Sequence, residues 1–153
     1  MKITDFLNAA RIIPDLKGKD KKSVLKEMAD WLAAQDRFLN AKTLFDTLLE
    51  REKISSTAIG EGVAIPHGKA VGIRKVAGIF ARSLQGVNFE SLDGGPTHLF
   101  FVLLAPEDSA ADHLKALARI SRLLKDGSFR VRLMEGKTSE EIFAVIQEED
   151  EKF

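Results

Sequence analysis

The feature that most constrains the fold is a continuous apolar run in the second half of the chain. Residues 98–105 read HLFFVLLA, and every residue after the histidine is apolar. A run of this length is typical of a β-strand that is covered on both faces, because a strand with one wet face alternates apolar and polar residues. A second run, VAGIFARSL at residues 76–84, also has strand length. Such strands predict a sheet that needs a layer of helices on each face.

The regions on either side of these runs show helical spacing of apolar residues. Before the strands, the pattern predicts helices over residues 20–36 and 40–53, with Asp20 and Asn40 as N-caps. Weaker strands are expected at Ile12–Leu16 and Ile59–Ile65.

After the second strand, three more helices are predicted. A Ser109-x-x-Asp112 capping box is expected to open the first, which Gly127 would end. A short helix is expected at Ser128–Glu135, and Thr138-x-x-Glu141 is expected to cap the last one.

These elements predict one α/β domain over residues 1–153, a single-domain sandwich in which helices flank a mixed β-sheet on both faces. The length suits one domain with its own core. Residues 147–153 form an acidic tail, which we expect to be solvated and frayed.

Composition argues against several classes of function. Lys plus Arg equals Asp plus Glu at 23 each, which does not favour a nucleic-acid partner bound through bulk positive charge. The lack of cysteine excludes disulfides, thiolate nucleophiles and cysteine-ligated metals. The N-terminus does not resemble a signal peptide, and the longest apolar run is too short to cross a bilayer. We therefore expect a soluble, cytoplasmic protein without membrane insertion.

Residues 60–69, GEGVAIPHGK, pose the main question about function. A P-loop needs four residues between its two glycines, but five separate Gly62 from Gly68, and neither Ser nor Thr follows Lys69. The dinucleotide fingerprint G-x-G-x-x-G also fails, because Ile65 stands where its last glycine should be. The nucleotide interpretation therefore fails on spacing.

What remains is a histidine, His67, that stands between a proline and a glycine. Pro66 fixes its own φ, and Gly68 permits a sharp change of direction or a close approach by another molecule. The pattern fits a rigid platform that presents His67, and it fits equally well a plain surface turn. A metal site is a weaker alternative, because His67, His98 and His113 lack tight ligand spacing. A serine hydrolase of the α/β type would need a G-x-S-x-G elbow, which this sequence lacks.

The wider stretch from Arg51 to Lys69, REKISSTAIGEGVAIPHGK, resembles a known phosphorylation-site motif. It is the motif of the fructose/mannitol family of enzyme IIA domains in the bacterial phosphoenolpyruvate-dependent phosphotransferase system, and within that family it is most similar to the nitrogen-regulatory type. The likeness extends from about Ile3 to Ile146. One departure is Ala58, where many members carry glycine.

The resemblance implies roles for individual residues. His67 would accept a phosphoryl group from a small histidine-containing phosphocarrier protein, with no cofactor or metal. Arg51 would be the arginine near that site, and His113 would be its second histidine. The loop around the phosphate would contain Ser56, Thr57 and Gly68.

Without the resemblance, other interpretations of the same residues would prevail. Arg51 would be expected to form a surface ion pair with Glu50 or Glu52, which contributes little. His113 would be expected on a helix surface, and His98 is interpreted as structural or incidental.

The leading hypothesis is a phosphoryl-relay protein that regulates a target protein through its phosphorylation state. A neutral imidazole suits this role, because it is nucleophilic near pH 7. Two alternatives stay open: a sugar-specific enzyme IIA that passes phosphate to a IIB domain, and a binding module that keeps the fold without the chemistry. No fused transporter domain is expected in the sequence, which favours the regulatory type.

Overall fold

The two apolar runs pair with each other at the centre of the sheet. In the computed structural model, which describes residues 1–152, β5 (Ala77–Val87) and β6 (Thr97–Ala105) are antiparallel, with Phe80 opposite Phe101. On the outer side of β5 lies β1 (Ile12–Ile13), which pairs with it in parallel. The mixed sheet predicted from the sequence is confirmed.

The other side of β6 carries the short strands that hold the glycine-rich stretch. Both β3 (Val63–Ala64) and β4 (His67–Lys69) pair in parallel with β6. The edge strand β2 (Ala58–Gly60) is antiparallel to β3. The single strand expected at Ile59–Ile65 is therefore two strands, because the chain reverses at Gly60, Glu61 and Gly62, which all have positive φ.

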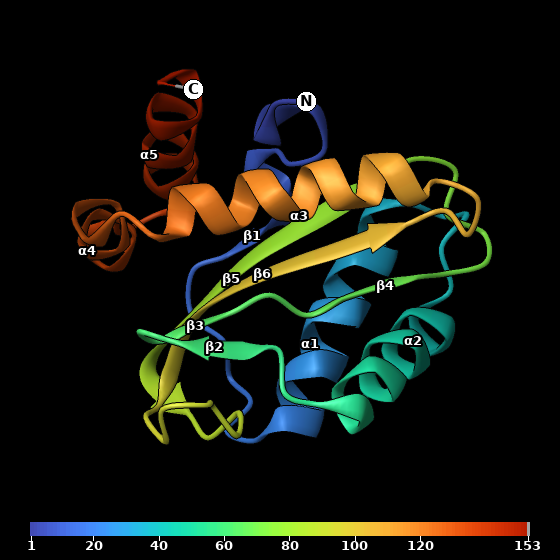
Figure 1. Cartoon of the computed structure of the whole chain (residues 1–153), viewed down its shortest axis with the longest axis horizontal. Helices are drawn as coiled ribbons and strands as arrows, with labels where there is room; N and C mark the ends of the chain where they lie inside the picture. Colours follow the sequence, from blue (N-terminus) through green and yellow to red (C-terminus); the bar gives the residue numbers. More distant parts are fainter. Residues whose placement is uncertain (153) are drawn as a thin grey trace.

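Helices cover both faces of the sheet, as Figure 1 shows. One face carries α1 (Lys21–Gln35) and α2 (Ala41–Ile54). The other carries α3 (Ala110–Leu124), α4 (Gly127–Glu135) and α5 (Ser139–Glu151), together with the 3₁₀ turn η1 (Ile3–Asp5); a second turn, η2 (Ala9–Arg11), leads into β1. These elements confirm the predicted α/β sandwich.

The residues of β6 divide between the two layers in strict alternation. Phe100, Val102 and Leu104 belong to the core beneath α1 and α2. Their neighbours Leu99, Phe101, Leu103 and Ala105 belong to the core beneath α3 and α5. Alternate side chains of a strand point to opposite faces, so a strand between two helical layers must be apolar throughout.

Most of the predicted helix caps form. Asp20 accepts from the backbone N–H of Ser23, Asn40 from that of Thr43, and Thr138 from that of Glu141. These bonds satisfy N–H groups that have no partner within the helix.

Two predictions about the ends of α3 are wrong. The Ser109 side chain makes no capping bond, because its ψ of 51° lies outside the extended region that an N-cap needs. Gly127 does not end α3, which stops at Leu124, but is instead the first residue of α4. The Asp126 side chain caps that helix by accepting from the N–H of Ser128.

The prediction of a frayed tail is also wrong for the residues that the structure describes. α5 continues to Glu151, and the side chains of Glu149 and Asp150 are buried. Arg119 Nε donates to the Asp150 carboxylate over 2.7 Å, and the N–H of Thr4 donates to it over 3.2 Å. The tail is ordered because α3 and the N-terminal segment provide partners for its charge. Phe153 lies outside the described residues.

Candidate functional site

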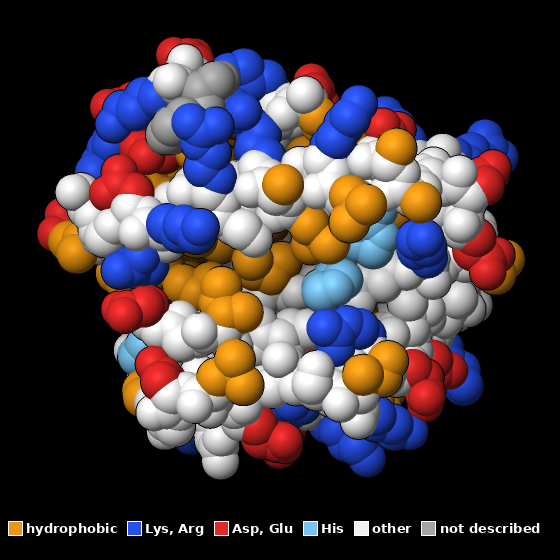
Figure 2. Space-filling view, in the orientation of Figure 1, with side chains coloured by type: hydrophobic (Ala, Val, Ile, Leu, Met, Phe, Trp, Pro, Cys, Tyr) orange, Lys and Arg blue, Asp and Glu red, His pale blue; other side chains and the backbone are white. Residues whose placement is uncertain are grey.

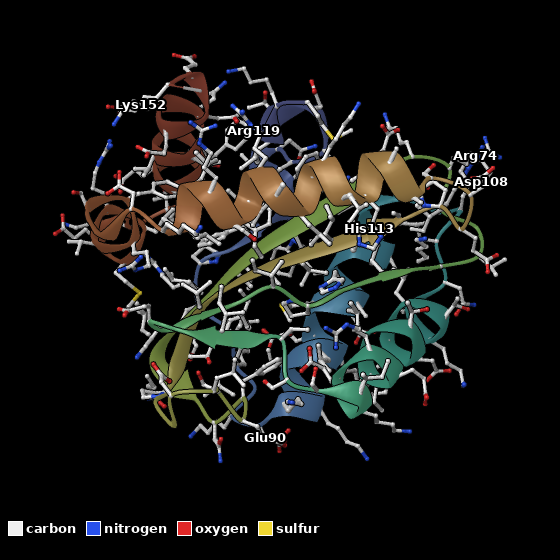
Figure 3. All side chains as sticks on the ribbon, in the orientation of Figure 1. Arg74, Glu90, Asp108, His113, Arg119 and Lys152 are labelled. Atoms are coloured by element: carbon white, nitrogen blue, oxygen red, sulfur yellow. The ribbon has the colours of Figure 1, made fainter. Side chains whose placement is uncertain are left out.

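Two histidines from distant parts of the chain meet at one end of the sheet. His67 opens β4, and His113 lies near the start of α3 and points toward the sheet (Figure 3). Their ring centroids are 5.6 Å apart in an edge-to-face arrangement with an interplanar angle of 75°. In the space-filling view, histidine side chains appear together on this face, beside an apolar surface and a cation (Figure 2). The structure thus brings together the two histidines that the resemblance singled out.

The contacts of His67 fix its tautomer. Its Nδ1 lies 2.7 Å from the carbonyl oxygen of Ile65. A carbonyl oxygen only accepts, so Nδ1 must carry the hydrogen, and in the neutral ring Nε2 then holds the lone pair. Burial lowers the pKa of His67 below its ordinary value of 6.5; the charge of Arg51 also lowers it, whereas the bond to Ile65 and the charge of Glu52 oppose the shift. The ring is therefore neutral near pH 7.

His113 is buried, and one of its nitrogens has no partner. The residue is 7% exposed, and Nε2 makes no hydrogen bond within the described part of the chain. Burial lowers the pKa of His113, and repulsion from the His67 ring when it is protonated and from the charge of Lys69 lowers it further. A buried polar atom without a partner costs free energy, so Nε2 is suited to bind a group that enters the site. The alternative of a surface helix histidine is wrong.

Arg51 lies in the last turn of α2 and does not form the surface ion pair that we considered. Its guanidinium donates to the carbonyl oxygen of Ser55 over 3.0 Å. Of the two candidate partners, Glu50 pairs with Lys53 and Glu52 pairs with Lys21. A guanidinium has five N–H donors, so one backbone contact leaves others for an anionic group.

The three residues expected in a phosphate loop have other contacts in this structure. Ser56 Oγ donates to the carbonyl oxygen of Phe89 over 2.7 Å. Thr57 is buried, and its hydroxyl donates to Glu52. At Gly68, a Cβ atom would lie 2.6 Å from Thr47 Cγ2, so glycine is required for β4 to pack against α2. These contacts attach the three residues to Phe89, Glu52 and α2. Their place around a phosphate stays a prediction.

Two charged residues near the histidines were missed in the sequence. Lys69 lies two residues beyond His67 on β4, so both side chains point to the same side of the strand. Glu52 is buried, although it is a carboxylate. A signal was available for Glu52: it follows Leu44 and Leu48 at four-residue spacing, which places it on the buried stripe of α2.

The interpretation of His98 as structural fits its contact, since its Nδ1 lies 2.9 Å from the Ser83 carbonyl oxygen. Within residues 1–152, no group of three His, Asp or Glu side chains could hold a metal ion, and no helix is long and apolar enough to cross a membrane.

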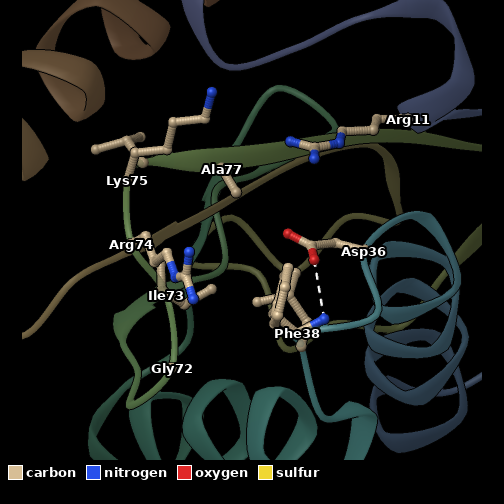
Figure 4. A pocket seen from close by; sticks show the side chains of 10 residues that line it. Arg11, Asp36, Phe38, Gly72, Ile73, Arg74, Lys75 and Ala77 are labelled. Atoms are coloured by element: carbon tan, nitrogen blue, oxygen red, sulfur yellow. Dashed lines mark hydrogen bonds between the residues drawn. The ribbon is translucent and has the colours of Figure 1, made fainter.

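A separate cavity of about 360 Å³ lies near the loop that follows β4 (Figure 4). Arg11, Asp36, Phe38 and Arg74 contribute to its walls, and the Arg74 guanidinium lies 4.6 Å from the centroid of the Phe38 ring. Neither histidine of the pair lines this cavity, so it is distinct from the candidate site.

Comparisons with known proteins cover nearly the whole chain. A family model described as "Phosphoenolpyruvate-dependent sugar phosphotransferase system, EIIA 2" matches residues 5–149. A nitrogen regulatory protein of Bradyrhizobium diazoefficiens is 47% identical over 146 residues, which is 95% of each chain. The fructose-specific EIIABC component of Bacillus subtilis is 39% identical over 150 residues, which is 98% of this chain and 24% of that protein.

A solved structure extends the likeness to three dimensions. The crystal structure of the nitrogen regulatory protein IIA-Ntr from Neisseria meningitidis matches with a TM-score of 0.86 at 34% identity. The match covers 94% of this chain and 98% of that one.

Proposed function

The chain belongs to the EIIA 2 family of the phosphoenolpyruvate-dependent sugar phosphotransferase system, and on this premise we propose that it is a regulatory histidine phosphocarrier that is phosphorylated on His67. The family and the nitrogen regulatory relatives support a phosphotransfer component that regulates through its phosphorylation state. The single observation that carries the choice of residue is the edge-to-face pairing of His67 with His113, whose ring centroids are 5.6 Å apart. The 2.7 Å contact of His67 Nδ1 with Ile65 then leaves the lone pair on Nε2.

The proposed step is an in-line transfer between two imidazoles. The lone pair of His67 Nε2 attacks the phosphorus of a phosphohistidine on a small carrier protein. The new N–P bond forms as the carrier's N–P bond breaks, and the carrier's imidazole leaves with the electron pair of that bond. The His67 ring gains positive character as its nitrogen bonds to phosphorus, and the hydrogen bond from Nδ1 to Ile65 stabilises that charge.

Two neighbours of His67 are suited to bind the phosphoryl oxygens. In its neutral Nε2–H form, His113 would donate to one oxygen, which would satisfy the nitrogen that lacks a partner. Arg51 would direct its remaining N–H groups at the equatorial oxygens, where charge spreads in the transition state. In this proposal no metal or organic cofactor takes part.

Regulation would follow from the charge that phosphorylation adds. A phosphoryl group brings roughly −1.5 to −2 charges at neutral pH. Beside the site the surface is apolar (Figure 2), and Leu114, the residue after His113, is 68% exposed. A partner that binds this surface would respond to the state of His67. We place this exchange in the cytoplasm, with a small phosphocarrier as donor and a regulated protein as target.

A sugar-specific enzyme IIA is the second candidate function, because the fructose-specific relative is 39% identical. In that case the phosphoryl group would pass from His67 to a IIB domain. Incubation of the phosphorylated protein with a fructose-type IIB domain would distinguish the two functions, since rapid transfer to that domain would favour the sugar-specific role.

Phosphoenolpyruvate, enzyme I and the phosphocarrier provide the direct test. We expect intact-mass analysis to show a gain of about 80 Da, the mass of one phosphoryl group, which is lost in acid. The gain should vanish in His67→Ala and persist in the matched control His98→Gln. A full gain in His67→Ala would refute the assignment, and the lack of any gain in the wild-type protein would leave a binding module without the chemistry.

A further inference from the structure

We propose that Glu52 is a positioning residue for His67: through Thr57 and Ile65, its buried carboxylate determines which ring nitrogen is free to accept the phosphoryl group. The inference rests on the proposed function and deepens it. Glu52 does not touch the reacting atoms in this proposal, so it acts on the tautomer through the backbone. Its charge also acts on the pKa of His67, which it raises.

The Glu52 carboxylate is held in a closed set of contacts. Its side chain is 1% exposed, and Oε1 lies 3.0 Å from Lys21 Nζ. The same oxygen accepts from the N–H of Thr57 over 3.1 Å, and Oε2 accepts from the Thr57 hydroxyl. Removing a carboxylate from water is unfavourable unless such charge-assisted bonds offset the loss of hydration. These contacts therefore fix Thr57 firmly relative to α2 and to the start of α1.

From Thr57, two further hydrogen bonds lead to the His67 ring. The carbonyl oxygen of Thr57 accepts from the N–H of Ile65 over 3.1 Å. The carbonyl oxygen of Ile65 in turn accepts from His67 Nδ1 over 2.7 Å. Glu52 thus positions Thr57, and Thr57 positions Ile65. The Ile65 carbonyl oxygen is the acceptor that selects the tautomer of His67.

The coupling along this path is positional. The N–H and C=O groups of one residue belong to different peptide groups, so the carboxylate does not directly polarise the carbonyl that His67 contacts. A displaced Thr57 would move Ile65 and lengthen the bond to Nδ1. Part of the alignment would survive, because Leu103 of β6 donates to the Pro66 carbonyl oxygen over 2.9 Å and holds the same segment from the other side.

A carboxylate is an unusual choice for this buried position. Replacement of a buried ion pair by packed apolar residues is often neutral or stabilising, so stability alone does not explain the pair. Glu52 also lies next to Arg51 in the last turn of α2. The same turn therefore carries the Arg51 guanidinium, which is proposed to bind the phosphoryl group, and the Glu52 carboxylate, which is proposed to orient His67 as the acceptor of that group.

The test compares Glu52→Gln with the matched control Glu50→Gln. Glu50 lies two residues earlier in α2, and its side chain is exposed and pairs with Lys53. Imidazole nitrogen NMR of the unphosphorylated proteins reports which nitrogen carries the hydrogen. We expect the wild-type protein and Glu50→Gln to show the Nδ1–H form of His67. Glu52→Gln should show a mixture with the Nε2–H form, and its single-turnover phosphorylation should be about tenfold slower, the effect of one weakened hydrogen bond.

A second variant keeps the inference testable if Glu52→Gln fails to fold. Thr57→Val keeps the N–H bond to Glu52 and removes the hydroxyl bond, and it should shift the tautomer in the same direction by a smaller amount. An unchanged tautomer in a folded Glu52→Gln would overturn the inference, whatever its rate. If wild-type His67 is never phosphorylated, the proposed function fails instead, and the tautomer comparison still judges the role of Glu52.

Discussion

Substitution of Gly68 by alanine tests whether β4 needs its close approach to α2. A Cβ atom at residue 68 would lie 2.6 Å from Thr47 Cγ2, whereas carbon atoms in contact normally stay about 3.5–4.0 Å apart. The Thr47 side chain or one of the two elements would therefore have to move by about 1 Å. Overpacking of this kind costs about 1–3 kcal/mol, so we expect Gly68→Ala to lower the free energy of unfolding by that amount.

The same displacement should impair the candidate site. Gly68 follows His67 directly on β4, so a strand pushed away from α2 carries the imidazole with it. We expect slower single-turnover phosphorylation of Gly68→Ala by the phosphocarrier, because in-line transfer is sensitive to small errors of position.

Thr47→Ser provides the matched control, since it removes only the methyl group that would clash. The hydroxyl bond to the Thr43 carbonyl oxygen, 2.9 Å long in the wild-type protein, can persist. Urea unfolding of the four proteins of this double-mutant cycle should show that Gly68→Ala costs much less in the Thr47→Ser background. Equal costs in both backgrounds would refute the steric explanation.

Four further predictions address the site and the core. Arg51→Ala should slow phosphorylation of His67 by roughly five- to a hundredfold in single-turnover assays, since it removes a charge-assisted donor; unchanged kinetics would contradict its role. His113→Ala should slow the same transfer, because it removes the Nε2 proposed to bind a phosphoryl oxygen. It should change the urea midpoint little, because that nitrogen has no partner to lose, and an unfolded variant would show that the residue is structural. Because burial holds the pKa of both histidines below 6.5, the unfolded chain binds protons more readily, so stability should fall as the pH drops below 6.5 and fall less in His67→Ala; an equal slope would contradict the lowered pKa. Arg82→Met should destabilise the fold by about 2–4 kcal/mol in urea unfolding, because buried Arg82 donates to four backbone carbonyl oxygens that would lose their partner; a wild-type midpoint would refute this.

The parts of the fold that local sequence determines were predictable. The apolar run at residues 98–105 indicated a doubly covered strand, and Asp20 and Asn40 cap their helices as expected. The capping box at Ser109 failed because the backbone there adopts a ψ that the sequence pattern does not reveal. The ordered tail was missed for a different reason, since Asp150 depends on Arg119, which lies 31 residues away.

In the candidate site, too, only the features that neighbouring residues determine were predictable from the sequence. The stiff neighbours of His67 are adjacent in sequence, so its presentation on a rigid segment was a reasonable expectation. Its pairing with His113 required the resemblance, because only the packing of α3 against β6 brings the two rings together. The contacts of Glu52 with Lys21 join the end of α2 to the start of α1. No local pattern predicts such a pair. The burial of Glu52 was missed too, although its four-residue spacing from Leu48 was an available signal.

The bonds around Asp150 also bring the two described ends of the chain together. Lys2 Nζ donates to the Asp150 carbonyl oxygen over 2.8 Å, and α5 and the start of the chain both lie at the top of Figure 1. Neighbouring termini let a domain be spliced into a host polypeptide, or be circularly permuted with a brief linker, without opening its core. A fold of this kind is thus suited to serve both as a stand-alone protein and as a cassette within a larger one.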